Sequence, residues 1–132
     1  MTTEPGETDL ASLLAAMRPE LHATPYVFCS VDTETLAGLS VAPLGLFRET
    51  EGITLIVTSE QAGAHGLSPS STWACITLKV HSSLAAVGFL AAISTRLAQA
   101  GISLNAVSAY YHDHLFVPWE SREQALRLLQ DW

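Results

Sequence analysis

The segment Trp73–Pro118 constrains the fold more than any other stretch, because strand and helix patterns alternate along it with clear breaks between them. At its start Ile76, Leu78 and Val80 alternate with polar neighbours, which predicts a half-buried strand. His81-Ser82-Ser83 then interrupts the alternation with groups that can cap a helix. The segment therefore begins with a strand, and a helix is expected next.

Helical periodicity follows this interruption. Leu90, Ile93 and Leu97 fall at i, i+3 and i+7, so one apolar stripe of the helix can pack on a sheet. Gly101 comes just after the stripe, where a left-handed residue commonly ends a helix. We therefore expect a single helix between the strand and Gly101.

The chain then returns as two strands and a last helix. Residues 102–107 alternate with period two, His112-Asp113-His114 breaks the run, and residues 115–117 resume it. Ser121 with Gln124 has the spacing of a capping box. The apolar stripe of this last helix is Ala125, Leu128, Leu129 and Trp132. The order βαββα is most of a split-βαβ, ferredoxin-like domain of the α+β class.

The residues before Trp73 follow a similar plan. The expected elements are a helix with its stripe at Leu10–Met17, a strand at Tyr26–Val31, a hairpin of residues 44–49 with 53–57, and a short helix after a Thr58–Gln61 capping box. Residues 32–42 are expected to be irregular, because Gly38 weakens any short helix there. Residues 1–7 lack periodic apolar positions and are expected to be a mobile tail.

Four stretches carry a resemblance to a known family: YVFCSV, LFRETEGITLIV, ITLKVHSSLAAVGFLAA and GISLNAVSAYYHDHLFVP. With them the chain resembles the ACT domains, most closely small bacterial proteins with two ACT units, and its second half also resembles the ACT units of cytosolic arginine sensors. The resemblance implies tandem ferredoxin-like halves of βαββαβ type, with antiparallel sheets and helices on one face. It also implies binding of an amino acid or similar metabolite to regulate something else.

The predicted halves are residues 8–69 and 70–132, since residues 68–71 are the one linker-like stretch. The second half has no strand after its last helix. That strand is expected from the other half or from another chain, because it would cover an open sheet edge. A dimeric α+β barrel that traps a substrate between sheets is the alternative architecture.

Composition and charge narrow the class of protein. The 132 residues are 48% hydrophobic with a net charge of −7, and six Lys and Arg residues are scattered along the chain, so we expect no nucleic-acid partner. No apolar run reaches the roughly 20 residues needed to span a bilayer, and the acidic first residues do not resemble a secretory signal. We therefore expect a cytoplasmic protein with no membrane partner, in which Cys29 and Cys75 are buried and unpaired.

The loop Val80–Gly88 is the main candidate site. Free N–H groups and a partial positive charge at a helix N-terminus suit the carboxylate of an amino acid. The family resemblance implies ligand contacts from His81, Ser82, Ser83, Val87 and Gly88. The alternative is purely structural: the serines cap the helix and Gly88 allows close packing.

The strand beside this loop adds further candidates. Asn105 and Ser108 can offer side-chain hydrogen bonds to a ligand. The resemblance implies backbone groups from Ala106 and Val107, and it places Asp113 at an acidic position that could hold a cationic group. The alternative interpretation makes Asp113 a turn residue between two strands.

The same region suggests a metal site, which its spacing disfavours. His112 and His114 point to one face of an extended segment and Asp113 to the other, so at most two of them could share an ion. We therefore expect no metal and no cofactor.

No catalytic motif stands out in the sequence. We expect a non-catalytic sensor that binds an amino acid and forms a homodimer. The alternatives are a small metabolic enzyme that uses His81 or His114, and a structural partner subunit with an empty site.

Overall fold

The computed structural model describes residues 6–67 and 71–132, which group into two compact units. Unit 1 combines residues 6–22 with 74–132, and unit 2 contains the described residues between 23 and 73. Residues 8–22, predicted to belong to the first half, thus group with most of the second half. Three of the four predicted linker residues, 68–70, lie outside the described residues.

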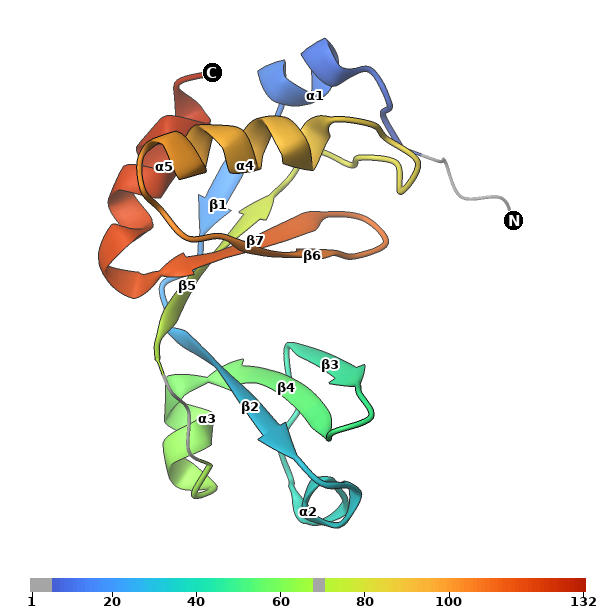
Figure 1. Cartoon of the computed structure of the whole chain (residues 1–132), viewed down its shortest axis with the longest axis vertical. Coiled ribbons are helices and arrows are strands. Elements are labelled where there is room, and N and C mark those ends of the chain that lie inside the picture. The colour runs from blue at the N-terminus through green and yellow to red at the C-terminus, as the bar shows by residue number, and fades with distance from the viewer. Residues whose placement is uncertain (1–5, 68–70) are drawn as a thin grey trace. The chain divides into compact units, whose positions relative to one another are not determined.

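Unit 1 is a sheet with helices on one face (Figure 1). Its elements are α1 (Leu10–Ala15), β1 (Pro19–Leu21), β5 (Trp73–Leu78), α4 (Phe89–Gln99), β6 (Asn105–Ser108), β7 (Asp113–Pro118), the 3-10 helix η1 (Trp119–Ser121) and α5 (Arg122–Gln130). The strand order is β1-β5-β7-β6. The predicted strand, helix, two strands and helix after Trp73 are all present, so the ferredoxin-like prediction is confirmed for this unit.

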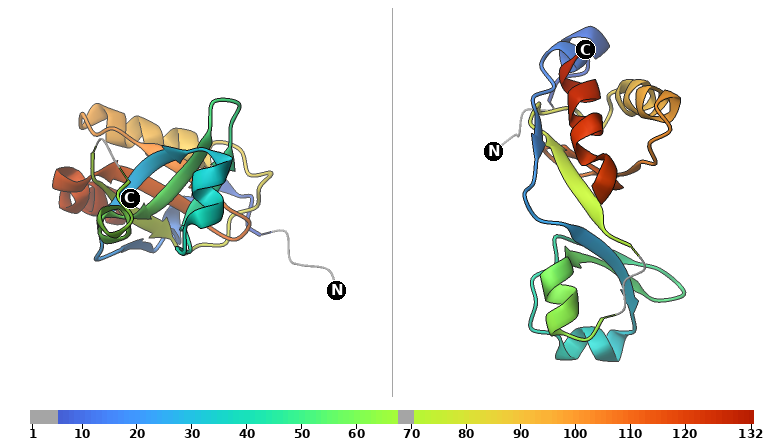
Figure 2. Two further views of the ribbon diagram at one scale, coloured as in Figure 1. Left: turned by 90° about the horizontal axis from the view of Figure 1, so that it is seen from below. Right: turned by 90° about the vertical axis from the view of Figure 1, so that its left-hand side faces the viewer.

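Strand β1 supplies the strand that the second half lacks. It pairs antiparallel with β5, with Pro19 opposite Leu78 and Leu21 opposite Ile76, and Figure 2 shows the two strands side by side. The covering strand therefore comes from the N-terminal part of the same chain, which is one of the two predicted sources.

The core of unit 1 lies between this sheet and its helices. Helix α1 contributes Leu13, which is fully buried, as the predicted stripe requires. The buried residues of this core are Leu13, Met17, Ala74, Ile76, Leu78, Phe89, Ile93, Leu97, Ile102, Leu115, Val117, Ala125 and Leu129. Trp132 lies outside it, contrary to the predicted stripe, because α5 ends at Gln130 and the indole stacks under the Arg96 guanidinium at 3.6 Å.

Unit 2 is a smaller antiparallel sheet. Its elements are β2 (Tyr26–Val31), α2 (Thr33–Gly38), β3 (Gly45–Arg48), β4 (Ile53–Thr58) and α3 (Ser59–Ala64), and β4 pairs with both β2 and β3. The predicted hairpin is thus confirmed. Its core consists of Val27, Cys29, Val31, Ile53, Leu55, Val57 and Ala62. The predicted capping box is also present, since the Thr58 and Gln61 side chains each accept a hydrogen bond from the other's backbone N–H.

Two local predictions are wrong. Residues 32–42 are not wholly irregular, because the Asp32 carboxylate accepts a 2.7 Å hydrogen bond from the Thr35 N–H and caps α2, which continues as far as Gly38. Ser121 makes no capping hydrogen bond at the start of α5. It is the last residue of η1, so the backbone already turns before α5 begins and the serine does not adopt the extended conformation of a capping residue.

Both cysteines are buried and unpaired, as predicted. Burial raises the pKa of the Cys75 thiol to about 11, and burial also raises the pKa of Cys29. Both thiols are therefore protonated at neutral pH and serve as small apolar side chains.

The surface carries apolar side chains at a sheet edge. Phe47 on the edge strand β3 is 72% exposed.

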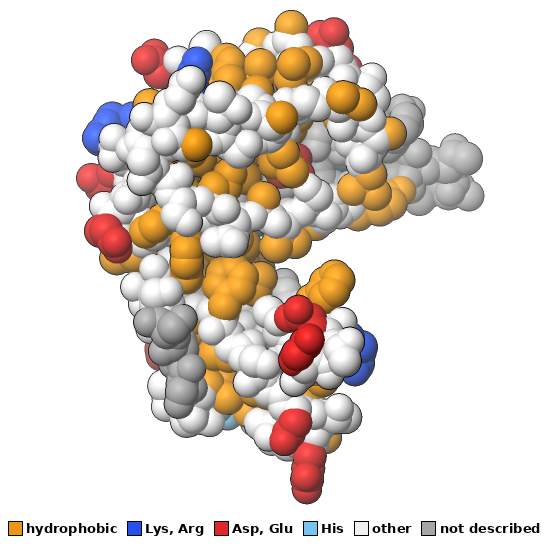
Figure 3. Space-filling view, viewed as in Figure 1, with side chains coloured by type: hydrophobic (Ala, Val, Ile, Leu, Met, Phe, Trp, Pro, Cys, Tyr) orange, Lys and Arg blue, Asp and Glu red, His pale blue; other side chains and the backbone are white. Residues whose placement is uncertain are grey.

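Among the described residues, Lys and Arg side chains do not gather into one patch on the face shown in Figure 3. None of the helices in the described ranges has the length and apolar character needed to cross a membrane.

Candidate functional site

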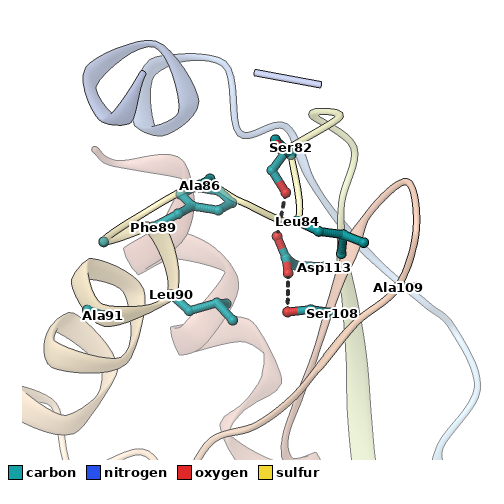
Figure 4. A pocket seen from close by; sticks show the side chains of 11 residues that line it. Ser82, Leu84, Ala86, Phe89, Leu90, Ala91, Ser108, Ala109 and Asp113 are labelled. Atoms are coloured by element: carbon teal, nitrogen blue, oxygen red, sulfur yellow. Dashed lines mark hydrogen bonds between the residues drawn. The ribbon is translucent and has the colours of Figure 1, made fainter. Parts of the chain in front are cut away.

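Unit 1 contains a cavity of about 180 Å³ at the N-terminal end of α4 (Figure 4). The loop after β5, the first turn of α4, the end of β6 and the start of β7 form its walls. The lining residues are Ser82, Ser83, Leu84, Ala86, Gly88, Phe89, Leu90, Ala91, Ser108, Ala109 and Asp113. The cavity therefore joins the candidate loop to the neighbouring strands.

Asp113 is the one charged side chain among these lining residues, and it is only 5% exposed. The Ser82 hydroxyl donates to one carboxylate oxygen at 2.8 Å and the Ser108 hydroxyl donates to the other at 2.6 Å (Figure 4). Among the described residues no Lys or Arg forms an ion pair with this carboxylate. A buried carboxylate that accepts only neutral donors is a strong attractor for a cation.

The start of α4 supplies the opposite kind of group. Gly88 is the N-cap residue, with a left-handed φ of +91°, and no side chain caps this helix end. The first helical hydrogen bond is donated by Ala92 to the Gly88 carbonyl, at 2.9 Å. The three amides before it, of residues 89–91, belong to residues that line the cavity, and such amides attract anions.

The alternative interpretation, in which Ser82 and Ser83 cap the helix, is wrong, because α4 begins six residues after Ser83. The Ser83 hydroxyl instead accepts from the Ala85 N–H at 3.1 Å, and the Ser83 carbonyl accepts from the Ala86 N–H at 3.0 Å. Ser83 thus stabilises a separate turn that forms one wall of the cavity.

The prediction of a mobile tail is wrong for Gly6 and Glu7, while residues 1–5 lie outside the described part. The Glu7 N–H donates to the His81 carbonyl at 2.8 Å, and the Ser83 N–H donates to the Glu7 carbonyl at 2.9 Å. Glu7 and Ser82 form an isolated parallel bridge. The N-terminal segment is therefore fixed to the outside of the cavity wall.

Five of the ten predicted contact residues line the cavity: Ser82, Ser83, Gly88, Ser108 and Asp113. Asp113 is the first residue of β7, so it is not a turn residue. Its carboxylate contacts one candidate from the loop, Ser82, and one candidate from the strand, Ser108.

The other five predicted residues do not line the cavity. The His81 ring packs 5.2 Å from the Tyr111 ring, and Val87 is 84% exposed. Asn105, Ala106 and Val107 lie farther along β6, whose residues rise about 3.3 Å each, so only its last residue, Ser108, reaches the cavity.

The sequence prediction missed six lining residues: Leu84, Ala86, Phe89, Leu90, Ala91 and Ala109. Three of them form the first turn of α4. The available signal was Gly88, because glycine is among the residues favoured at the N-cap of a helix.

A second polar cluster lies on the opposite side of β5 from the core. The Thr77 hydroxyl is 2.7 Å from His22 Nε2 and 2.9 Å from His114 Nδ1. Burial lowers the pKa of His114, and the neighbouring His112 and His22 lower it further. In the described ranges no group of three His, Cys, Asp or Glu side chains is placed to hold a metal ion.

The fold and the cavity together define a class of protein: tandem ferredoxin-like units, one of which has a helix N-terminus and a buried carboxylate lining one cavity. ACT-domain family models match residues 5–74 and 70–131. The chain therefore belongs to the ACT-domain family.

Solved structures agree with this assignment. A protein of unknown function from Vibrio cholerae, VC0802, described as a possible transport protein, is 49% identical and has a TM-score of 0.81, over 90% of this chain and 92% of that chain. The ligand-free regulatory subunit of aspartate kinase from Thermus thermophilus has a TM-score of 0.67 at 12% identity, over 88% of this chain and 97% of that chain, which is a likeness of fold. No curated protein sequence matches the chain.

Proposed function

We propose that this protein is a non-catalytic regulatory module that binds a small amino acid or a related zwitterionic metabolite in the cavity of unit 1. The buried Asp113 carboxylate, held by two serine hydroxyls and without a cationic partner among the described residues, carries the proposal. An ammonium or guanidinium group of a ligand provides the missing positive charge.

The start of α4 supports a carboxylate as the second charged group of this ligand. Residues 89–91, which carry its free amides, line the same cavity, and free amides at a helix N-terminus favour a carboxylate. A molecule with one cationic and one carboxylate group satisfies both sites at once. The cavity of about 180 Å³ favours a small ligand.

The regulatory part of the proposal rests on the family and on the fold. ACT domains are regulatory units, and the fold is like that of a regulatory subunit of aspartate kinase. The lining residues include no Cys, His or Lys, so this lining does not contain the Ser–His or Cys–His pairs that commonly activate a nucleophile. These features favour a sensor over the alternative of a small metabolic enzyme.

Thermal unfolding with each of the twenty amino acids tests the proposal. A ligand at 100 times its Kd adds about 2.7 kcal/mol to the free energy of unfolding. We expect at least one small amino acid to raise the Tm of the wild type. Asp113→Asn removes the charge but keeps the shape, and it should abolish the shift.

The matched control is Asp131→Asn, which removes one negative charge from an exposed position just after α5 and should keep the shift. Ethylamine and propionate, which each carry one of the two charged groups, should stabilise far less than the amino acid. If no amino acid shifts the Tm, or if Asp113→Asn responds as the wild type does, the proposed ligand site is wrong and the structural-subunit alternative gains support.

A further inference from the structure

The N-terminal segment of unit 1 contacts the wall of the cavity at both ends of the loop that forms it. Glu7 makes two backbone hydrogen bonds to the turn at residues 81–83. At the other end of the loop, Leu10 of α1 lies close to Gly88, since a Cβ built on Gly88 would be 3.5 Å from Leu10 Cδ2. We call residues 6–10 the strap.

The strap is tightly fitted at Gly6. This residue has a φ of +85°, and a Cβ built on it would be 2.8 Å from the Ser83 nitrogen and 2.9 Å from the His81 oxygen. Both are backbone atoms that cannot rotate away. Glycine is therefore required for the strap to pair with this turn.

The turn that the strap holds also carries a ligand-site residue. Ser82 is the bridge partner of Glu7, and its hydroxyl donates to the buried Asp113 carboxylate at 2.8 Å. A single residue, Ser82, thus connects the strap to the charged group of the cavity. The strap is fixed in turn to α1, because the Glu7 side chain accepts from the Asp9 N–H and the Asp9 carboxylate caps α1 through the Ser12 N–H.

We propose that Gly6 and Glu7 are positioning residues of the ligand site, and that pairing of the strap and binding of the ligand favour each other. The proposal rests on the proposed function for its ligand, but the coupling between strap and Asp113 exists without one. A ligand that needs Ser82 and Asp113 in place binds the paired state more tightly. By linkage, the ligand then stabilises the strap by the same factor.

Amide hydrogen exchange measured by NMR tests the ligand-free coupling. Ser82→Ala removes the hydroxyl that joins the strap turn to Asp113. We expect the exchange of the Glu7 and Ser83 amides to accelerate by about fivefold or more, after correction for intrinsic rates. Ser108→Ala removes the other hydroxyl donor to Asp113 and leaves the strap turn intact, so its effect on these amides should be less than about twofold.

A second pair of variants tests the coupling in the other direction. Gly6→Ala prevents strap pairing, and we expect it to weaken the binding of any amino acid that stabilises the wild type by about fivefold or more. Gly101→Ala introduces comparable backbone strain at a φ of +74°, with nothing within 4 Å of the added methyl group, and should leave the affinity unchanged.

Unchanged exchange of Glu7 and Ser83 in Ser82→Ala would overturn the coupling whether or not a ligand is found. Equal affinity of Gly6→Ala and the wild type would also overturn it. If no amino acid binds the wild type, the proposed function fails. The exchange comparison still decides whether the strap and Asp113 are coupled.

Discussion

The Thr77 hydroxyl has one proton to donate and lies within hydrogen-bond distance of two imidazole rings, those of His22 and His114. It can donate to one ring nitrogen and accept from the other while both rings are neutral. Burial disfavours the charged form of His114, as do His112, His22 and Lys79, whereas Asp113 favours it. Protonation of His114 therefore costs more in the folded than in the unfolded state.

This arrangement predicts a loss of stability in mild acid. Because the pKa of His114 is lowered from 6.5 on folding, the unfolded state binds more protons below that pH, and the free energy of unfolding should fall as the pH drops from about 6.5. His114→Asn should reduce this slope in urea unfolding between pH 5 and 8. His65→Asn, at an exposed histidine after α3, should keep it, and an unchanged slope in His114→Asn would contradict the account.

At the scale of elements, two segments have the sequence spacing of a capping box, and only one of them forms it. Thr58 caps α3 through its hydroxyl, with the Gln61 side chain returning the bond, whereas Ser121 makes no such bond. Thr58→Val keeps a β-branched side chain but removes the hydroxyl, and we expect a cost of about 1 kcal/mol. Ser121→Ala should change stability by less than about 0.5 kcal/mol. Urea unfolding measures both, and equal costs would contradict the structure.

Elements with local signals were predictable from sequence. The stripe of α1, the hairpin of β3 and β4, and the glycine stop after α4 each depend on residues close together in the chain. The start of α4 was marked locally only by Gly88. Ser83 has the right side chain to cap a helix, but the turn at residues 81–83 is held by Glu7, more than 70 positions earlier in the sequence.

The candidate site, too, was predictable only as far as local signals reach. Its polar residues follow from residue type, because Ser82, Ser108 and Asp113 can each bind a polar ligand group. Their mutual hydrogen bonds depend on how β6 and β7 pair, with Ser108 opposite Asp113 in the register. Asn105, three residues earlier, was an equally good candidate by type and lies on the wrong part of the strand.

At the scale of the whole molecule, the organisation of the chain depends on a three-residue strand. Strand β1 is short, begins with proline and has no alternation long enough to detect, yet it pairs with β5 and closes one edge of unit 1. Unit 1 is therefore built from two separate parts of the sequence, and Leu13 and Met17 from the N-terminal part are buried in its core. A linear division of the sequence could not reveal this arrangement.

The central claim is that a zwitterionic amino acid binds between the start of α4 and Asp113. An NMR titration of amide shifts, with an amino acid that stabilises the wild type, tests it most directly. We predict saturable shifts at the amides of residues 89–91 and at Ser82 and Asp113, with β4 of unit 2 serving as the unperturbed reference, and no saturation in Asp113→Asn. Saturable shifts confined to other residues, or the same titration in Asp113→Asn, would contradict the claim.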